Sequence, residues 1–145
     1  GVQTCALPIY APATKAVVGF AAGETFDLGV VTIRPQTRFA AIYVTALERD
    51  QDVSTAGTLL VCAMARARNT GMRVALDRFL IAKGKGPVLM EPVVADIAVR
   101  RGGTPRVLLL DHDGCPTEAE VPVKDGVFRI DGAVHRTAYY AIRFE

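Results

Sequence analysis

The 145-residue sequence contains no tryptophan, only three cysteines, and no basic run interleaved with aromatic residues. Without tryptophan, the chain lacks the planar side chain that stacks best on a pyranose ring, which disfavours a dedicated carbohydrate-binding module. The cysteines have neither metal-ligand spacing nor the density of a disulfide scaffold. With 17 basic and 15 acidic residues the formal net charge is +2, so a nucleic-acid-binding protein is also disfavoured.

Catalytic signatures are missing as well. The chain has no G-x-S-x-G motif and no H-E-x-x-H motif, and its two histidines are isolated. We therefore expect no catalytic residue, no cofactor-binding residue and no metal ligand in this chain. Half of the residues are apolar and 22% are charged, which favours one folded domain over disorder or membrane insertion, so no membrane partner is expected.

Residues 1–9 read GVQTCALPI, which fits neither a signal peptide nor a membrane span. A DNA sequence that encodes them resembles the adapter ligated to fragments in short-read sequencing. We interpret residues 1–9 as adapter-derived and residues 10–145 as one domain of a longer protein, and we leave residues 1–9 out of the fold prediction.

Turn signals recur at short intervals between stretches rich in Val, Ile, Phe and Tyr, which predicts an antiparallel β-sandwich of roughly eight to nine strands. Residues 93–100 alternate with one apolar face, as a half-buried strand does. Residues 39–47 have no strongly polar face, so we expect a strand in the middle of a sheet. A final strand is expected in residues 139–145, with Tyr140, Ile142 and Phe144 on one face.

A hairpin is predicted at Asp125-Gly126, between residues 121–123 and 127–130, and Pro122 assigns its first arm to a sheet edge. Residues 58–68 fit both a helix and a strand by periodicity, and residues 72–82 are equally ambiguous.

Several strings are informative as a set. They are FAAIYVTALERD, TLLVCAMARARNTGM, GKGPVLMEPVVADIAV, RVLLLDHDG and FRIDGAVHRTAYYAI. Together they resemble the C-terminal β-sandwich region that follows the (β/α)8 barrel of bacterial glycoside hydrolase-like proteins related to β-galactosidases and cellulases. The resemblance implies that residues 58–68 are a strand and that YAPATKAVVGF packs back onto the barrel. It also implies that the acid/base and the nucleophile belong to the barrel.

Acidic residues are the first candidates for chemistry, because glycoside hydrolysis uses two carboxyl groups about 5 to 10 Å apart. Glu48, Asp50 and Asp52 cluster in one expected loop, where solvated turn residues are the favoured interpretation. Glu91 lies among apolar neighbours, and a structural role such as meeting an arginine across strands is favoured for it.

The string DHDG places Asp111 and Asp113 on one face of a strand, where they would converge on a cation such as calcium. A strand that runs into a turn is the favoured interpretation. A self-contained enzyme pairing Glu91 with either aspartate is a further hypothesis. His135 lies in an expected loop without a nucleophile motif nearby, and the alternation around Cys62 predicts a buried, inert thiol.

Four arginines, Arg66, Arg68, Arg73 and Arg78, form a candidate basic patch. Solvation at the end of a sheet, or pairing with the acidic loop, is the favoured interpretation. An inter-domain contact is the functional alternative, because the planar fork and apolar stem of arginine suit interfaces.

From these observations we expect a non-catalytic accessory domain that supports a separate catalytic barrel, in a glycoside hydrolase parent, by interdomain packing. Such a domain exposes an apolar face where its partner packs. The alternative is a polysaccharide-binding module, which needs at least two exposed rings, from Tyr10, Tyr43, Tyr139 or Tyr140. The expected partner is a catalytic domain of the same chain, while a homo-oligomer and a polysaccharide stay open. The localisation is undetermined, with secretion or the periplasm as the options considered.

Overall fold

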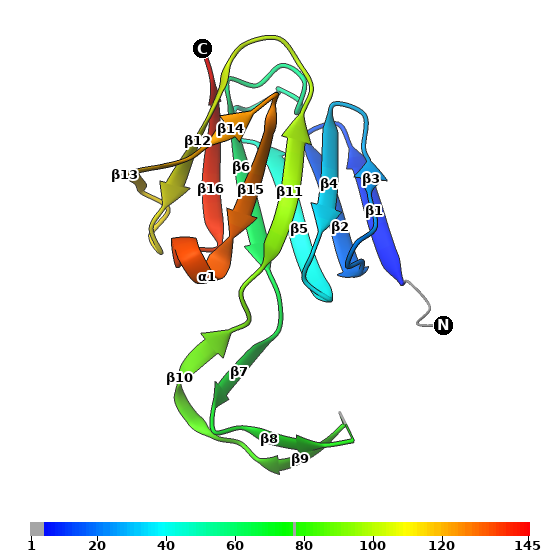
Figure 1. Ribbon diagram of the computed structural model, residues 1–145, viewed down its shortest axis with the longest axis vertical. Coiled ribbons are helices and arrows are strands. Elements are labelled where there is room, and N and C mark those ends of the chain that lie inside the picture. The colour runs from blue at the N-terminus through cyan, green and yellow to red at the C-terminus, as the bar shows by residue number, and fades with distance from the viewer. Residues whose placement is uncertain (1–4, 77) are drawn as a thin grey trace.

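The computed structural model describes residues 5–76 and 78–145, and shows two packed antiparallel sheets (Figure 1). The first sheet has seven strands in the order β1 (Ala6–Ala11), β2 (Thr14–Phe20), β5 (Phe39–Ala46), β6 (Thr58–Met64), β16 (Tyr139–Phe144), β12 (Pro105–Leu110) and β13 (Pro116–Val121). The second has five in the order β14 (Val123–Lys124), β15 (Val127–Asp131), β11 (Val94–Val99), β4 (Val31–Pro35) and β3 (Phe26–Asp27). The predicted all-β antiparallel sandwich is confirmed. Two-residue edge strands, β3 and β14, add to the strand count.

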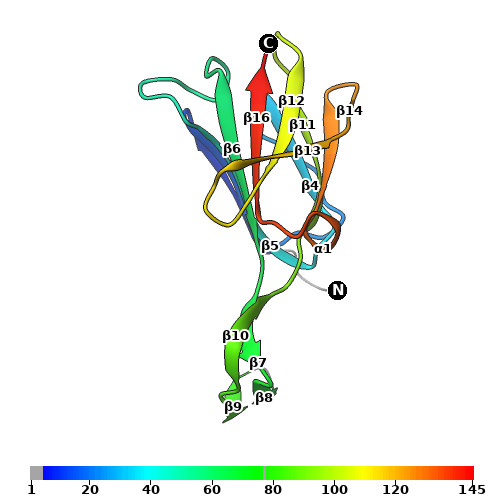
Figure 2. The same cartoon turned by 90° about the vertical axis from the view of Figure 1, so that its left-hand side faces the viewer.

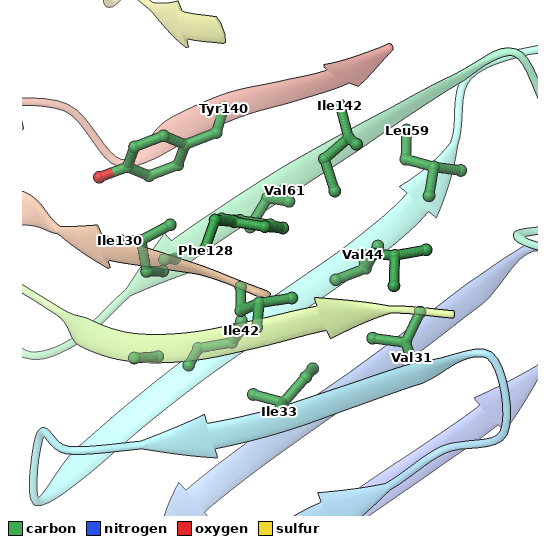
Figure 3. Packing of buried hydrophobic residues seen from close by; sticks show 14 of the residues in the cluster. Val31, Ile33, Ile42, Val44, Leu59, Val61, Phe128, Ile130, Tyr140 and Ile142 are labelled. Carbon is green, nitrogen blue, oxygen red and sulfur yellow. The ribbon is translucent and has the colours of Figure 1, made fainter. Parts of the chain in front are cut away.

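The core lies between the two sheets and is built from alternate residues of their central strands (Figure 3). Because successive side chains of a strand point to opposite faces, every second residue of β5 and β6 faces inward. Those inward residues include Ile42, Val44, Leu59 and Val61, each 0% exposed. From the second sheet they meet Val31, Ile33, Phe128 and Ile130. Burial of one such side chain stabilises the fold by about 1.5–3 kcal/mol.

Three strand predictions are confirmed by the sheet order. β11 buries Ala95, Ile97 and Val99 and turns Asp96 outward. β5 lies between β2 and β6, in the middle of the larger sheet. β16 pairs with both β6 and β12, and its residue Tyr140 is 1% exposed.

The predicted hairpin at Asp125-Gly126 joins β14 to β15. Both turn residues have positive φ, 52° and 73°, which is the conformation that a two-residue hairpin turn needs. Pro122 lies between β13 and β14, where the chain passes from the edge of one sheet to the edge of the other. At this place the missing N–H of proline costs no ladder hydrogen bond.

Residues 65–91 leave the sandwich as a long β-ribbon, which we call the arm (Figures 1 and 2). At its base β7 (Ala67–Thr70) pairs with β10 (Lys85–Met90), and beyond them β8 (Arg73–Ala75) pairs with β9 (Phe79–Ala82). Of the ambiguous residues 58–68, residues 58–64 form β6 in the sandwich and residues 67–68 begin β7 in the arm, with residues 65–66 between the two strands. Pairing of β6 with both β5 and β16 outweighs the small helical preference of its residues.

The N-terminal residues that the fold prediction left out are partly described. Ala6–Ala11 form β1 along the edge of β2, whereas residues 1–4 lie outside the described residues. No helix within residues 5–76 and 78–145 is long and apolar enough to cross a membrane.

One short helix, α1 (Gly132–His135), corrects the prediction of a loop around His135. Its first turn is capped by Asp131, whose carboxylate accepts hydrogen bonds from the backbone N–H groups of Ala133 and Val134 at 3.0 and 3.3 Å. Aspartate is a favourable residue at this capping position, because it satisfies backbone donors that the helix itself leaves open.

Candidate functional site

The outward side of the seven-stranded sheet carries apolar side chains on its central strands. We call this surface the outer face and define it by Val18, Phe20, Phe39, Ala41, Tyr43, Cys62 and Met64. The register joins them into rows across the sheet: Val18 lies opposite Ala41, which lies opposite Met64. Phe20 and Met64 are 43% and 37% exposed, so apolar area reaches the surface on both flanking strands.

Aromatic packing orders one end of the outer face. The rings of Phe20 and Phe39 meet edge to face with their centroids 5.2 Å apart. The guanidinium of Arg38 lies 5.8 Å above the Phe20 ring, in cation–π geometry. This end of the face is therefore a firm apolar platform with one cation at its border.

The outward side of the five-stranded sheet is polar by contrast. There Asp96 on β11 accepts hydrogen bonds from Nε and Nη2 of Arg129 on β15, at 2.7 and 2.8 Å. The hydrogen bond from Arg129 holds the pKa of Asp96 below its ordinary value. Ion pairs and charged side chains are what a solvated sheet face carries. On the outward side of the seven-stranded sheet, the ion pair between Arg106 and Glu120 lies at the β12–β13 edge. The central strands of that sheet therefore keep an apolar outer face.

Two hollows adjoin the outer face. A groove of about 350 Å³ is lined by Leu47, Leu60, Leu110, Tyr139 and the β12–β13 turn at residues 112–114, and we call it the groove. A cleft of about 340 Å³ lies at the base of the arm, and its lining includes Met64 of β6 with Val88 and Met90 of β10. Tyr139 and His112 line both hollows. The apolar surface therefore continues from the sheet onto the arm.

The acidic loop between β5 and β6 has a structural role. Oε1 of Glu48 accepts a hydrogen bond from the backbone N–H of Thr58 at 2.9 Å. Asp52 accepts backbone hydrogen bonds from Ser54 and Thr55 at 2.7 and 3.1 Å. The Ser54 hydroxyl also donates a hydrogen bond to Asp52, and this bond is the largest cause that lowers the pKa of Asp52. The backbone hydrogen bonds lower that pKa further. Glu48 and Asp52 thus organise their own turn and Asp50 is exposed, in agreement with the expected turn residues.

The carboxylates of Glu91 and of Asp111 in the DHDG string also hold local structure by accepting hydrogen bonds. Oε2 of Glu91 accepts a hydrogen bond from Nε of Arg66 at 3.0 Å, which is the cross-strand arginine contact expected for it. Oδ1 of Asp111 accepts hydrogen bonds from the backbone N–H groups of Asp113 and Cys115 at 2.9 and 2.8 Å, so it closes the β12–β13 turn. Within residues 5–76 and 78–145, no three His, Cys, Asp or Glu side chains gather as a metal site would require.

His135 is joined to the core through Tyr140. Its Nδ1 lies 3.1 Å from the Tyr140 hydroxyl oxygen and 3.2 Å from the backbone nitrogen of Asp131. Burial raises the pKa of Tyr140 to about 12. The histidine therefore supports a buried tyrosine and α1, which is a structural function.

Cys62 lies on the outer face between Tyr43 and Tyr139, which are its partners in the register. It is half-buried rather than buried, because its strand turns it away from the core. Partial burial nevertheless raises the pKa of its thiol, so the thiolate that would act as a nucleophile is disfavoured.

The four arginines of the candidate basic patch all belong to the arm. Arg66, Arg68, Arg73 and Arg78 are exposed, and the arm leaves β6 at the end opposite the acidic loop. They therefore do not meet that loop within the same chain. The sequence could not show this, because it does not reveal that residues 65–91 leave the sandwich.

The four tyrosines considered for sugar binding are spread over different environments. Tyr10 is 59% exposed and Tyr140 is 1% exposed. Tyr43 and Tyr139 are half-buried and share one row of the seven-stranded sheet.

Comparison of the chain with protein-family models, with curated proteins and with solved structures finds no match. The outer face, the groove and the arm are therefore the features on which a functional conclusion has to rest. One sequence signal pointed to the first of them. Residues 39–47 lack a polar face, which indicates a central strand and equally indicates an outward side that is made to be covered.

Proposed function

We propose that this chain is a non-catalytic accessory β-sandwich domain of a glycoside hydrolase-like enzyme, and that its outer face packs against the catalytic (β/α)8 barrel. The observation that carries the proposal is the contrast between the apolar outer face and the ion-paired outward side of the other sheet. An antiparallel sheet with one solvated side carries polar residues there, so an apolar outward side marks a contact surface.

The energetics of such a contact are favourable. Interfaces between domains of one chain typically bury about 600–1,500 Å². Burial of apolar area contributes about 25 cal/mol per Å² before the entropy of association is subtracted. Ala41 and Cys62, in the middle of the outer face, have small side chains that leave room for a second domain to approach.

The choice of enzyme class rests on the resemblance of the sequence strings to the β-sandwich of glycoside hydrolase-like proteins. A non-catalytic role is supported by the carboxylates. Glu48, Asp52, Glu91 and Asp111 each accept hydrogen bonds that organise local structure. None of those contacts is the arrangement of a general acid facing a nucleophile across a cleft.

The test is binding between this chain and the barrel domain encoded by the parent gene, measured by calorimetry. Met64→Glu places a charge on the outer face at a position that is 37% exposed. We expect this substitution to weaken binding at least about tenfold, because the carboxylate would be desolvated in the interface.

Val127→Glu is the matched control, since Val127 is 41% exposed on the outward side of the five-stranded sheet. It should leave the affinity unchanged. Equal affinities for the wild type and Met64→Glu would contradict the proposal, as would a parent gene that encodes no barrel.

A polysaccharide-binding module is the second candidate. Its support is the row formed by Tyr43, Cys62 and Tyr139, which places two half-exposed tyrosines on one side of the sheet. Aromatic rings on a shared face are the usual platform for sugar rings. Affinity electrophoresis on several glycans, comparing the wild type with Tyr43→Ala, distinguishes the two candidates. Retardation that the substitution removes supports this module, and uniform lack of retardation excludes it.

A further inference from the structure

The arm is an apolar ribbon that the sandwich does not cover. At its far end Leu76, Phe79, Leu80 and Ile81 are 81%, 58%, 53% and 59% exposed. A two-stranded ribbon alone is marginally stable in water, and a contiguous exposed apolar patch marks an interaction surface. We therefore expect a partner to cover the apolar side chains of the arm.

The arm is also cationic. By sequence, residues 65–91 contain six basic and two acidic residues, while the rest of the chain contains eleven basic and thirteen acidic residues. The arm thus carries a formal charge of +4 on a chain whose remainder carries −2. A complementary partner is apolar in its centre and acidic at its border.

A second arm is a poor partner. If two copies of β9 paired antiparallel about Leu80 and Ile81, Arg78 of each copy would lie opposite Lys83 of the other. Like charges directly opposite one another destabilise a strand pair. The charges that flank the apolar stretch therefore disfavour pairing between arms.

The groove has the complementary chemistry. Its apolar lining comes from Leu47, Leu60, Leu110 and Tyr139, and Leu47 is 55% exposed. Asp113 lies in its lining, and the β12–β13 hairpin that contributes this residue also carries Asp111 and Glu118, which are exposed. The chain thus holds both halves of a matched pair, an apolar cationic ribbon and an apolar acidic groove.

The far end of the arm does not reach the groove of its own chain. It leaves the end of the sandwich and points away from both sheets (Figures 1 and 2). We propose that the chain forms a symmetric dimer in which the arm of each copy lies in the groove of the other. A reciprocal exchange of this kind makes the two contacts equivalent and closes the assembly at two copies. The dimer goes beyond the proposed function, because it uses the groove and leaves the outer face to the barrel.

The experiment is sedimentation equilibrium of the full chain. Lys83→Glu/Lys85→Glu reverses the charge of the arm, and Asp113→Lys/Glu118→Lys reverses that of the groove; all four side chains are exposed. The wild type should be a dimer whose dissociation constant rises with salt concentration. Each pair of substitutions should raise that constant at least about tenfold, and combining both pairs should restore dimerisation, because attraction returns with the signs exchanged.

Lys124→Glu, at an exposed position on β14, is the control and should leave the dimer intact. Met64→Glu should also leave it intact, which separates a failure of the dimer from a failure of the proposed function. Circular dichroism confirms that each variant is folded. A wild type that is monomeric at every concentration overturns the proposal. A dimer that survives reversal of the arm charges overturns it too, and points to a contact elsewhere on the chain.

Discussion

In this sandwich, the position of a residue along its strand determines whether its side chain is in the core or on the surface, because successive side chains point to opposite faces. Phe128 and Val127 are neighbours on β15, yet Phe128 is 2% exposed in the core and Val127 is 41% exposed on the outward side. The strand geometry that separates them also separates core from surface everywhere in the two sheets. The effect of a substitution should therefore depend on its parity along the strand.

The first prediction uses this pair. Phe128→Ala should lower the free energy of unfolding by about 3–5 kcal/mol, because it leaves a cavity in a packed core. Val127→Ala should change it by less than about 0.5 kcal/mol. Urea denaturation followed by far-UV circular dichroism measures both, since the chain contains no tryptophan for fluorescence. Equal losses for the two variants would mean that the inward and outward sides of β15 are wrongly assigned.

The second prediction concerns pH. Arg129 lowers the pKa of Asp96 below its ordinary value of 3.8, so the folded state holds this proton less tightly than the unfolded state. The resulting stabilisation, about 1 kcal/mol or less for a partly exposed pair, is present above pH 3.8 and lost as the pH falls through the folded-state pKa.

Asp96→Asn should therefore be less stable than the wild type near pH 7, and the difference should shrink in acid. Urea melts at a series of pH values test this. Parallel stability curves for the two proteins, with a constant gap down to the lowest pH, would contradict it.

At the scale of elements, Gly84 determines how the arm is built. Its φ is +68°, and a Cβ there would lie 2.3 Å from the carbonyl oxygen of Thr70 and 2.6 Å from the nitrogen of Met72. Both contacts are with backbone, at the end of β7 and just beyond it, and backbone cannot move aside as a flexible side chain would. The glycine is needed where the two halves of the arm meet.

The third prediction follows from that contact. Gly84→Ala should disorder the arm while leaving the melting of the sandwich nearly unchanged, because the arm adds little to the core. Limited trypsin digestion after Lys83 and Lys85 should become faster. Gly86→Ala is the control, since no atom lies within 4 Å of a Cβ at that position. Unchanged digestion of Gly84→Ala would show that the arm tolerates the displaced backbone.

Several elements of the sandwich could be predicted from the sequence, but not β1, because residues 1–9 were left out of the fold prediction. Alternation identified β11 and the final strand, and Asp125-Gly126 identified the hairpin, because these are local signals. The secondary structure of residues 58–68 does not follow from their periodicity, which fits both a helix and a strand. Pairing of β6 with β5 and β16 determines that it is a strand. α1 is not predictable in this way, because it is one turn long and its signal is a single capping aspartate.

The arm and the groove could not be predicted in this way. A strand that pairs inside the sandwich and a strand that pairs in a protruding ribbon have the same local pattern. The groove depends on the β12–β13 turn lying near Leu47 and Tyr139, residues that are far apart in the sequence. The outer face is indicated by the sequence, because residues 39–47 have no polar side.

At the scale of the whole molecule, the outer face suits one kind of partner, and the arm with the groove suits another. The outer face is apolar and lies on the central strands of its sheet, which suits a second folded domain. The arm is apolar and cationic and the groove is apolar with acidic residues beside it, which suits a second copy of the chain. In this account the sandwich is a support that joins a barrel to a dimer, and the chemistry belongs to the barrel.

The central claim, that the outer face is the surface covered by the barrel, is tested most directly by the reactivity of Cys62. This thiol lies in the middle of the outer face, and replacing the exposed Cys5 and Cys115 by serine makes it the only thiol in the chain. Its rate of reaction with a maleimide is measured with and without the barrel domain of the parent gene. With the barrel at about ten times its dissociation constant, the account predicts a rate about tenfold lower. A complex that forms while Cys62 reacts at the rate of the free chain would contradict the claim.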